Sequence, residues 1–464
     1  MVEEELMKTL FLMSLLLIGL GLPVASEEKG ADYQATADRI VEASRATETG
    51  WDRLSTLCTL YPHRLSGTRG LEEAIDWIVG EMKKDGFDRV TTEEVTVPHW
   101  ERGAESLVVL KEKPETLAVL ALGGSVSTGP DGVEAEILVV DSYQDLEAKK
   151  DQAKGKIVVF DVPFTTYGET VGYRITGASR AADAGAVAAL LRSVTPHSLA
   201  TPHTGVMLYD ADSKKIPFGA ITPEAAQHFH RLQQAGQATR VKLILETRSY
   251  PDKISRNIIA EIRGSQFPEE VVVLGGHIDG WDIGEGAQDD GGGSLMCWEA
   301  LRTLSQLGLK PRRTVRVVLW TNEENGLQGA KTYRRLHDLE IKNHVLAIES
   351  DYGTFHPTGF AFTGQEPAVA MLQEIVSLLD SSVGEMKVRT PGGGADIGPL
   401  MAEGVPGAAL THNSKKYFWY HHSPADTLDK IEPKDFTDCV ATLAVTVFVV
   451  ADLPQRLPFG KPGD

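Results

Sequence analysis

One loop of the sequence concentrates side chains that bind divalent metal ions. Residues 275–294 (GGHIDGWDIGEGAQDDGGGS) follow the apolar run 271–274 and include His277, Asp289 and a series of glycines. A β-branched run that ends at Gly-Gly is typical of a buried strand entering a loop. Imidazole and carboxylate groups are ligands of Zn²⁺ and similar ions. The loop therefore predicts part of a metal site, whose remaining ligands must come from elsewhere in the chain.

Three later clusters contain the same residue types, and two of them directly follow an apolar run. They consist of Glu323 and Glu324, of Glu349 and Asp351, and of His421, His422 and Asp426. Each has an ordinary structural explanation when taken alone. Adjacent glutamates at a helix start interact with the helix dipole, and an Asp after a strand is usually a cap or turn residue. Four such clusters at successive strand ends of one sheet nevertheless favour a metal site.

The number of candidate ligands indicates two metal ions. Three carboxylates and two imidazoles exceed what one four-coordinate zinc needs while keeping an open position. If one carboxylate bridges, each ion has three protein ligands, and two Zn²⁺ against three carboxylates leave one positive charge to hold a hydroxide. A further, unligated carboxylate would take the proton of the water and pass it to a leaving amine. Glu323, next to a proposed ligand, is the candidate for this base.

The elements expected around these clusters form an α/β domain. After residue 250 the pattern predicts strands at 257–263, 271–274, 314–320 and 345–349, and helices at 293–306, 326–336 and 367–379. Apolar strands that alternate with amphipathic helices indicate a mostly parallel central sheet with helices on both faces. In such sheets ligands bind beyond the carboxyl ends of the strands. The clusters at the ends of the expected strands are therefore expected to meet at one edge.

The first half of the chain predicts a different order of secondary structure elements. Helical spacing predicts helices at 31–59 and 70–85, followed by a strand at 89–97. From 101 to 250, short strands alternate with Gly-rich turns around one helix at 176–184, which predicts an inserted β-rich module between catalytic segments 27–100 and 251–464. The scattered histidines of this module are expected to be surface or loop residues: His197, His203, His228 and His230.

Composition excludes several classes of protein. The net charge is −19, with 65 acidic against 46 basic residues and no Lys/Arg cluster, so nucleic acid is not an expected partner. Three cysteines, Cys58, Cys297 and Cys439, cannot all pair and support no disulfide framework.

The apolar run 10–22, followed by Pro23-Val24-Ala25-Ser26, predicts a signal peptide over 1–26 and a secreted protein without stable membrane insertion after cleavage. The alternative is an uncleaved anchor, and Met7 competes with Met1 as the start.

Several motifs together resemble one known family. The sequence is similar to the co-catalytic zinc aminopeptidase and carboxypeptidase family at His277-Ile278-Asp279, Asp289-Asp290-Gly291-Gly292, Glu323-Glu324, Glu349-Ser350-Asp351, Pro202-His203-Thr204-Gly205 and His422-Ser423-Pro424-Ala425-Asp426-Thr427. The resemblance covers nearly the whole mature chain. It implies a secreted exopeptidase with two zinc ions per chain that acts on dipeptides or short peptides as a homodimer. The inserted module resembles a protease-associated domain.

The resemblance also implies a role for each site residue. His277 and Asp351 would bind one zinc, Glu324 and His422 the other, and Asp289 would bridge them. Glu323 would be the general base. The remaining residues would support the ligands or contact substrate: Asp279 orienting His277 through its other ring nitrogen, His421 as a pocket neighbour, Asp426 in the histidine motif, and Asp396 in a loop near the substrate.

Two other functions remain open at this stage. One keeps the fold with a single zinc and a different reaction, such as glutaminyl cyclisation. The other is a non-enzymatic binding protein that uses the inserted module for partners. Under the peptidase hypothesis, the choice between aminopeptidase and carboxypeptidase also stays open. The loops that form the pocket for the substrate side chain cannot be located in the sequence.

Overall fold

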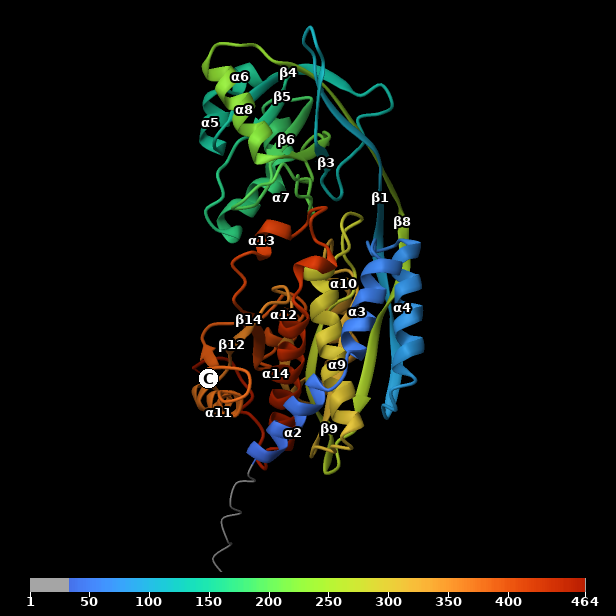
Figure 1. The fold of residues 1–464 in the computed structure, drawn as a ribbon. Coiled ribbons are helices and arrows are strands. Elements are labelled where there is room, and N and C mark those ends of the chain that lie inside the picture. The colour runs from blue at the N-terminus through green and yellow to red at the C-terminus, as the bar shows by residue number, and fades with distance from the viewer. Residues whose placement is uncertain (1–32, 464) are drawn as a thin grey trace, which may run out of the picture.

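A computed structural model describes residues 33–463 as two lobes joined by a long strand pair (Figure 1). The predicted signal peptide, 1–26, lies outside the described residues. One 14-stranded sheet runs through both lobes in the order β13-β12-β14-β11-β9-β10-β8-β4-β5-β6-β7-β3, with β1 and β2 off this path. None of the helices within 33–463 has the length and apolar composition needed to cross a membrane.

The lower lobe contains the predicted parallel sheet. Its strands are β9 (Phe267–His277), β10 (Arg313–Trp320), β11 (His344–Glu349), β12 (Pro357–Thr363), β13 (Lys387–Arg389) and β14 (Gly407–His412). Strand β9 pairs in parallel with β10 and β11, and β11 pairs in parallel with β14. Strand β12 is antiparallel to β14, and the lower end of β8 (Arg240–Ile262) is antiparallel to β10. The mostly parallel α/β sheet expected from the sequence is confirmed.

Several helices belong to the same lobe. They are α2 (Gln34–Arg45), α3 (Thr49–Leu60), α4 (Arg69–Met82), α9 (Gly292–Gln306), α10 (Gln328–Leu336), α11 (Glu366–Ser377), α12 (Gly398–Met401), α13 (Tyr417–Tyr420) and α14 (Pro433–Asp452), with short helices η1 (Ala287–Gly291), η2 (Asp338–Asn343) and η3 (Leu428–Lys430). The single helix expected at 31–59 is wrong, because two helices form there. Residues 46–48 between them are not helical, and the Thr49 N–H, at the start of α3, donates a hydrogen bond to the Thr47 hydroxyl at 3.1 Å.

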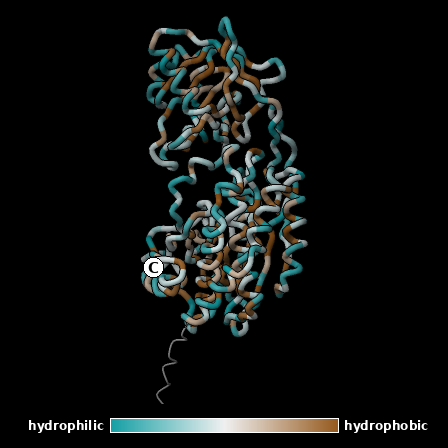
Figure 2. The backbone as a smooth tube through the Cα atoms, in the orientation of Figure 1, coloured by the Kyte–Doolittle hydropathy of each residue, from teal (hydrophilic) through white to brown (hydrophobic). Residues whose placement is uncertain are grey.

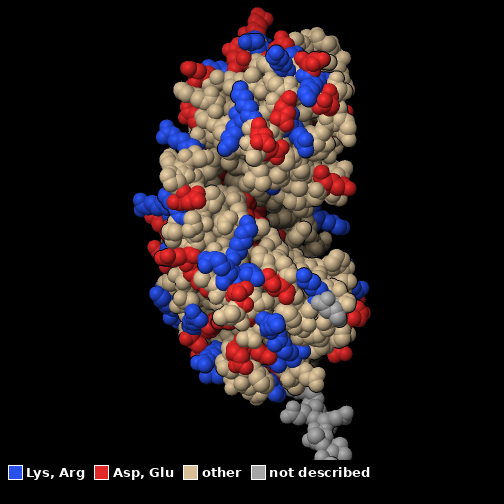
Figure 3. Space-filling view, turned by 180° about the vertical axis from the view of Figure 1, so that it is seen from behind, with Lys and Arg blue, Asp and Glu red and all other residues tan. Residues whose placement is uncertain are grey.

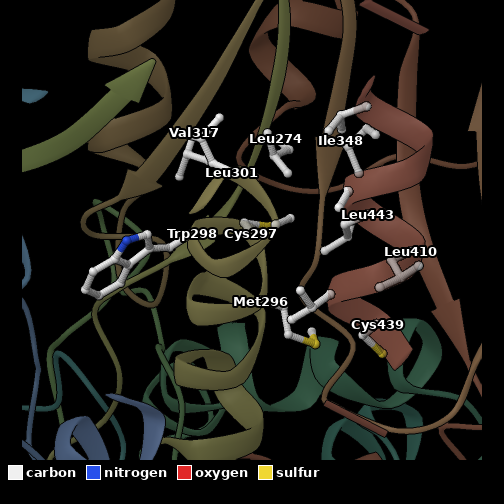
Figure 4. Packing of buried hydrophobic residues seen from close by; sticks show 14 of the residues in the cluster. Leu274, Met296, Cys297, Trp298, Leu301, Val317, Ile348, Leu410, Cys439 and Leu443 are labelled. Carbon is white, nitrogen blue, oxygen red and sulfur yellow. The ribbon is translucent and has the colours of Figure 1, made fainter. Parts of the chain in front are cut away.

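The core of the lower lobe lies where α9 and α14 cover the sheet (Figure 4). Leu274, Val317 and Ile348 from three neighbouring strands are fully buried there. Cys297 on α9 and Cys439 on α14 are buried among these apolar side chains, and both are free thiols, as is the buried Cys58. All three cysteines lie within the described residues and none is paired, as expected from their number.

The upper lobe, defined here as residues 115–234, contains a second parallel arrangement. Its elements are β2 (Glu115–Leu117), β3 (Val119–Ala121), β4 (Val133–Val140), α5 (Tyr143–Ala148), α6 (Lys150–Ala153), β5 (Ile157–Phe160), α7 (Tyr167–Asp183), β6 (Ala188–Arg192), β7 (Phe218–Ile221) and α8 (Pro223–Gln234). Strands β4 to β7 are parallel neighbours. This segment has more helix than the single helix predicted from its sequence, because α5, α6 and α8 form in addition to α7.

Strands β1 (Arg89–Val109) and β8 connect the two lobes. They pair antiparallel from Arg89 and Glu261 in the lower lobe to Val109 and Val241, which adjoin the upper lobe. Register shifts occur between Val97 and His99 and between Arg102 and Glu105. Apolar residues concentrate along the strands inside both lobes (Figure 2). On the face shown in Figure 3, basic and acidic side chains are interspersed rather than gathered by sign.

Candidate metal centre

The ends of three parallel strands bring the predicted clusters together. Strand β9 ends at His277, which pairs with Trp320 at the end of β10; Trp320 is three residues before Glu323. Strand β11 ends at Glu349, which pairs with Gly275 of β9, two residues before Asp351. Because these strands are parallel, the residues that follow them lie at one edge of the sheet. The sequence prediction of a common edge is therefore met.

Asp289 lies between two sets of side chains. Its Oδ1 is 3.3 Å from Nε2 of His277, and its Oδ2 is 3.2 Å from Nε2 of His422. Nε2 of His277 is also 3.4 Å from Oδ1 of Asp351, and Nε2 of His422 is 2.9 Å from Oε2 of Glu324. Two groups of three ligand-type residues thus share one carboxylate, the arrangement that a pair of metal ions requires.

Several buried polar atoms of these groups lack hydrogen-bond partners within the described residues. Within the described residues, His277 Nε2, Asp289 Oδ2, Glu324 Oε1 and Asp351 Oδ1 are buried and make no hydrogen bond. Each buried polar atom without a partner lowers the stability of the fold by about 1–3 kcal/mol. Several such atoms at one point therefore indicate that a ligand binds there. Imidazole nitrogen and carboxylate oxygen fit zinc. The residues present therefore fit the expected ions.

Two buried carboxylates hold the backbone around the ligands. Asp279 accepts hydrogen bonds from the N–H groups of Glu323 (3.1 Å) and Glu324 (3.3 Å). Asp426 accepts from the N–H groups of Gln288 (2.7 Å) and Asp289 (3.2 Å), and burial raises its pKa to about 7. One carboxylate thus fixes the glutamate pair, and the other fixes the shared aspartate.

The expected contact between His277 and the Asp279 carboxylate differs in detail. Nδ1 of His277 lies 3.8 Å from the carboxylate Oδ1 but 3.0 Å from the backbone oxygen of Asp279. The carboxylate instead points toward the N–H groups described above. Asp279 therefore supports His277 through its carbonyl, which can accept the Nδ1 proton and leave Nε2 free for a metal.

Asp290 is close to the ligands but is already engaged. Its two oxygens accept hydrogen bonds from the N–H groups of His277 and Gly293, each at 3.1 Å. Glycine is required at 293, because a Cβ there would lie 1.9 Å from the Ser350 oxygen and 2.2 Å from Oδ1 of Asp290. Asp290 therefore joins β9 to the start of α9, and the glycine run allows this close approach. Its carboxylate also lies with His277 and Asp351 in a group that could hold a metal ion.

Glu323 lines the cavity beside the shared aspartate. Burial, together with the neighbouring carboxylates of Asp351 and Glu324, raises its pKa well above the usual value, against the opposing effect of His277. A carboxylate with a raised pKa is suited to accept and return a proton near neutral pH.

His421 and Asp396 take different positions around the centre. The His421 ring stacks on His422 with centroids 3.6 Å apart, its Nε2 is 3.6 Å from Oδ2 of Asp289, and it lines the cavity. Asp396 is buried, neither of its oxygens makes a hydrogen bond within 33–463, and burial with Glu349 and Glu323 nearby raises its pKa well above the usual value. Asp396 itself does not line the cavity; its neighbours 393–395 do.

The cavity at this centre has a volume of about 550 Å³ and is formed by both lobes. The upper lobe contributes Tyr167, Arg174, Val206 and Leu208, none of which the sequence analysis selected. His203, grouped with surface or loop histidines, lies in a loop but is only 2% exposed. No local cluster marks these residues in the sequence; the motif 202–205 was the available signal.

Comparison with known proteins agrees with this geometry. The sequence profile of peptidase family M28 matches residues 257–447 of the chain. Human carboxypeptidase Q is 44% identical over 414 residues, covering 89% of this chain and 88% of that protein. The chain belongs to peptidase family M28. The expected class, a metallo-exopeptidase, is thereby confirmed.

Other relatives align with almost the whole length of this chain. Mouse carboxypeptidase Q is 42% identical over 463 residues, covering 97% of this chain and 98% of that one. The crystal structure of an M28 peptidase precursor from Shewanella amazonensis has a TM-score of 0.88 at 34% identity, covering 92% of this chain and 99% of that one. A zinc aminopeptidase from Bacillus subtilis, 21% identical with a TM-score of 0.65 and covering 88% and 98%, shares the fold.

Proposed function

We propose that this M28 chain is a two-zinc exopeptidase that hydrolyses the peptide bond of dipeptides or short peptides. The observation that carries the proposal is the sharing of Asp289 between two sets of ligand-type residues, several of whose buried atoms make no hydrogen bond within residues 33–463. His277 and Asp351 would hold one zinc, and Glu324 and His422 the other. The chemistry expected of bound zinc is polarisation of a carbonyl oxygen and acidification of water.

The proton transfers fall to Glu323. Its carboxylate would take a proton from the attacking water as the new C–O bond forms and return it to the leaving nitrogen as the C–N bond breaks. Asp279 holds the backbone N–H of Glu323, which keeps this carboxylate at the cavity wall. The upper lobe covers the same cavity with Tyr167 and Arg174, so substrate would bind between the lobes.

Neighbouring glutamates offer a matched test. Glu323→Gln should lower kcat by about 10²–10⁴-fold, the usual contribution of a general base, while both zinc ions stay bound. Glu324→Gln should instead lose zinc from one site. Retained turnover in Glu323→Gln would overturn the assignment of the base. A wild-type content of one zinc would favour the single-zinc alternative, and absence of chelator-sensitive peptidase activity would favour a binding protein.

The end of the peptide that is recognised can be measured with a dipeptide library and N-acetylated counterparts. For a dipeptide, aminopeptidase and carboxypeptidase describe cleavage of the same bond. Loss of hydrolysis on acetylation would mean that a free amine is recognised. Unchanged rates would mean that the carboxyl end is recognised, in keeping with the name of the carboxypeptidase Q relatives.

Three further features belong to the same proposal. The segment 101–250 would be a protease-associated domain inserted between 27–100 and 251–464. The protein would be secreted through a signal peptide at 1–26, supported by the apolar run and small residues there. It would act as a homodimer, which analytical ultracentrifugation of the mature chain would test: a single species at monomer mass would reject this part.

A further inference from the structure

The upper lobe touches the backbone of the proposed zinc ligand His422. The Thr204 N–H donates a hydrogen bond to the carbonyl oxygen of His422 at 2.8 Å. His422 has a φ of 59°, a left-handed conformation that a non-glycine residue keeps only when its surroundings enforce it. The contact from Thr204 is one of the interactions that fix this backbone.

The preceding residue of the upper lobe holds the adjacent carbonyl. Nδ1 of the buried His203 is 2.7 Å from the backbone oxygen of His421, and the His203 N–H donates to Oγ of Ser193 at 2.8 Å. A carbonyl oxygen can only accept, so Nδ1 of His203 carries the proton. Residues 203 and 204 therefore bind two successive carbonyl groups of the histidine motif.

The same segment also faces the imidazole ring of His422. The Thr204 carbonyl oxygen lies 3.3 Å from Nδ1 of His422, and Nη1 of Arg174 lies 3.3 Å from the same nitrogen. A guanidinium only donates, so the Thr204 carbonyl is the group that can accept a proton from Nδ1. Protonation at Nδ1 leaves Nε2, which faces Glu324 and Asp289, as the metal-binding atom.

Gly205 permits this approach. A Cβ at position 205 would lie 2.7 Å from Nδ1 of His422 and 2.3 Å from Nη1 of Arg174, and the φ of +133° is one that other residues rarely adopt. An alanine at 205 would therefore push on the ring of His422 and on the guanidinium that packs beside it.

The two histidine ligands differ in what supports them. Nδ1 of His277 meets a carbonyl of its own loop, that of Asp279 at 3.0 Å, whereas Nδ1 of His422 meets a carbonyl of the other lobe. We propose that residues 203–205 of the upper lobe are positioning residues for His422. Zinc binding by Glu324 and His422 then depends on upper-lobe contacts, whereas zinc binding by His277 and Asp351 does not; this inference rests on the proposed two-zinc function.

The test compares zinc binding in variants of the full chain. His203→Ala and Gly205→Ala should weaken one of the two zinc sites by about 10–100-fold, the usual effect of losing a group that supports a metal ligand. His203→Asn places an amide N–H near the position of Nδ1 and should restore two sites close to wild-type affinity. His228→Ala, in the same lobe on α8, is the matched control and should leave both affinities unchanged.

Affinities are measured by competition with a chromogenic zinc chelator, and circular dichroism of the zinc-free proteins checks folding. If Gly205→Ala fails to fold, the comparison of His203→Ala with His203→Asn decides alone. Two wild-type affinities in His203→Ala, or equal weakening of both sites, would overturn the inference while leaving the two-zinc function intact. Fewer than two zinc ions in the wild-type chain would instead overturn the proposed function.

Discussion

Replacing Arg64 should destabilise the lower lobe although this residue contacts no proposed ligand side chain. Its guanidinium is fully buried and donates hydrogen bonds to four backbone carbonyls: those of Ile278 (2.8 Å), Gly286 (2.8 Å), Glu285 (2.9 Å) and Tyr61 (3.1 Å). Three of these carbonyls belong to the metal loop. Arg64 thus fastens the loop 278–286 to the segment before α4.

The size of the effect follows from these contacts. Two of the four bonds are fully buried, and a hydrogen bond to a charged group contributes about 1.5–3 kcal/mol. With a smaller contribution from the two partly buried bonds, Arg64→Met should lower the free energy of unfolding by about 4 kcal/mol. Arg64→Lys should lose about half as much, because one ammonium cannot reach four carbonyls in the planar geometry of a guanidinium.

Urea unfolding of the zinc-free protein measures this free energy without a contribution from bound metal. Arg69→Met is the matched control, because the Arg69 side chain is 89% exposed and pairs with Glu73 on the surface. The control should change stability by less than about 0.5 kcal/mol. A loss of less than about 1 kcal/mol in Arg64→Met would refute the reasoning.

Two further predictions concern pH and turnover. Burial lowers the pKa of His344 from 6.5 to about 4, with Tyr333 Oη 3.0 Å from its Nε2. The unfolded chain therefore binds this proton first, and stability should fall by up to about 3 kcal/mol as the pH drops from 6.5 to 4. His344→Gln should remove this part of the pH dependence in urea titrations, and an unchanged slope would contradict it. Asp279→Asn should lower kcat by about 10–100-fold through the loosened N–H of Glu323, and an unchanged kcat would reject that role.

The sequence predicts the lower lobe well because its signals are local and repeated. The strands ending at His277, Trp320 and Glu349 are buried β-branched runs, each followed by polar ligand-type residues. Parallel pairing then places those ends together, so the ligand groups could be anticipated before any distance was known. The choice of Glu323 as base and Glu324 as ligand, by contrast, rested only on their adjacency and on family resemblance, since adjacent residues of one type carry no positional signal.

What the sequence missed depends on contacts between distant segments. Arg64 lies in a polar turn 214 residues before Ile278, whose carbonyl it binds. Arg174 and His203 belong to the upper lobe, and only the docking of that lobe on the segment around His422 brings Arg174 to the cavity and His203 to the backbone of His421. The single helix expected at 31–59 failed for a local reason, because a continuous apolar period concealed the break at residues 46–48.

Zinc stoichiometry in aspartate variants tests the central claim, that Asp289 is shared by two metal ions. Elemental analysis of the purified chain, equilibrated with zinc and freed of excess ion, should find two zinc ions in the wild type. Asp351→Asn should lose one ion, and Asp289→Asn should lose both. A wild-type content of one zinc, or an Asp289→Asn variant that binds as much zinc as Asp351→Asn, would contradict the account.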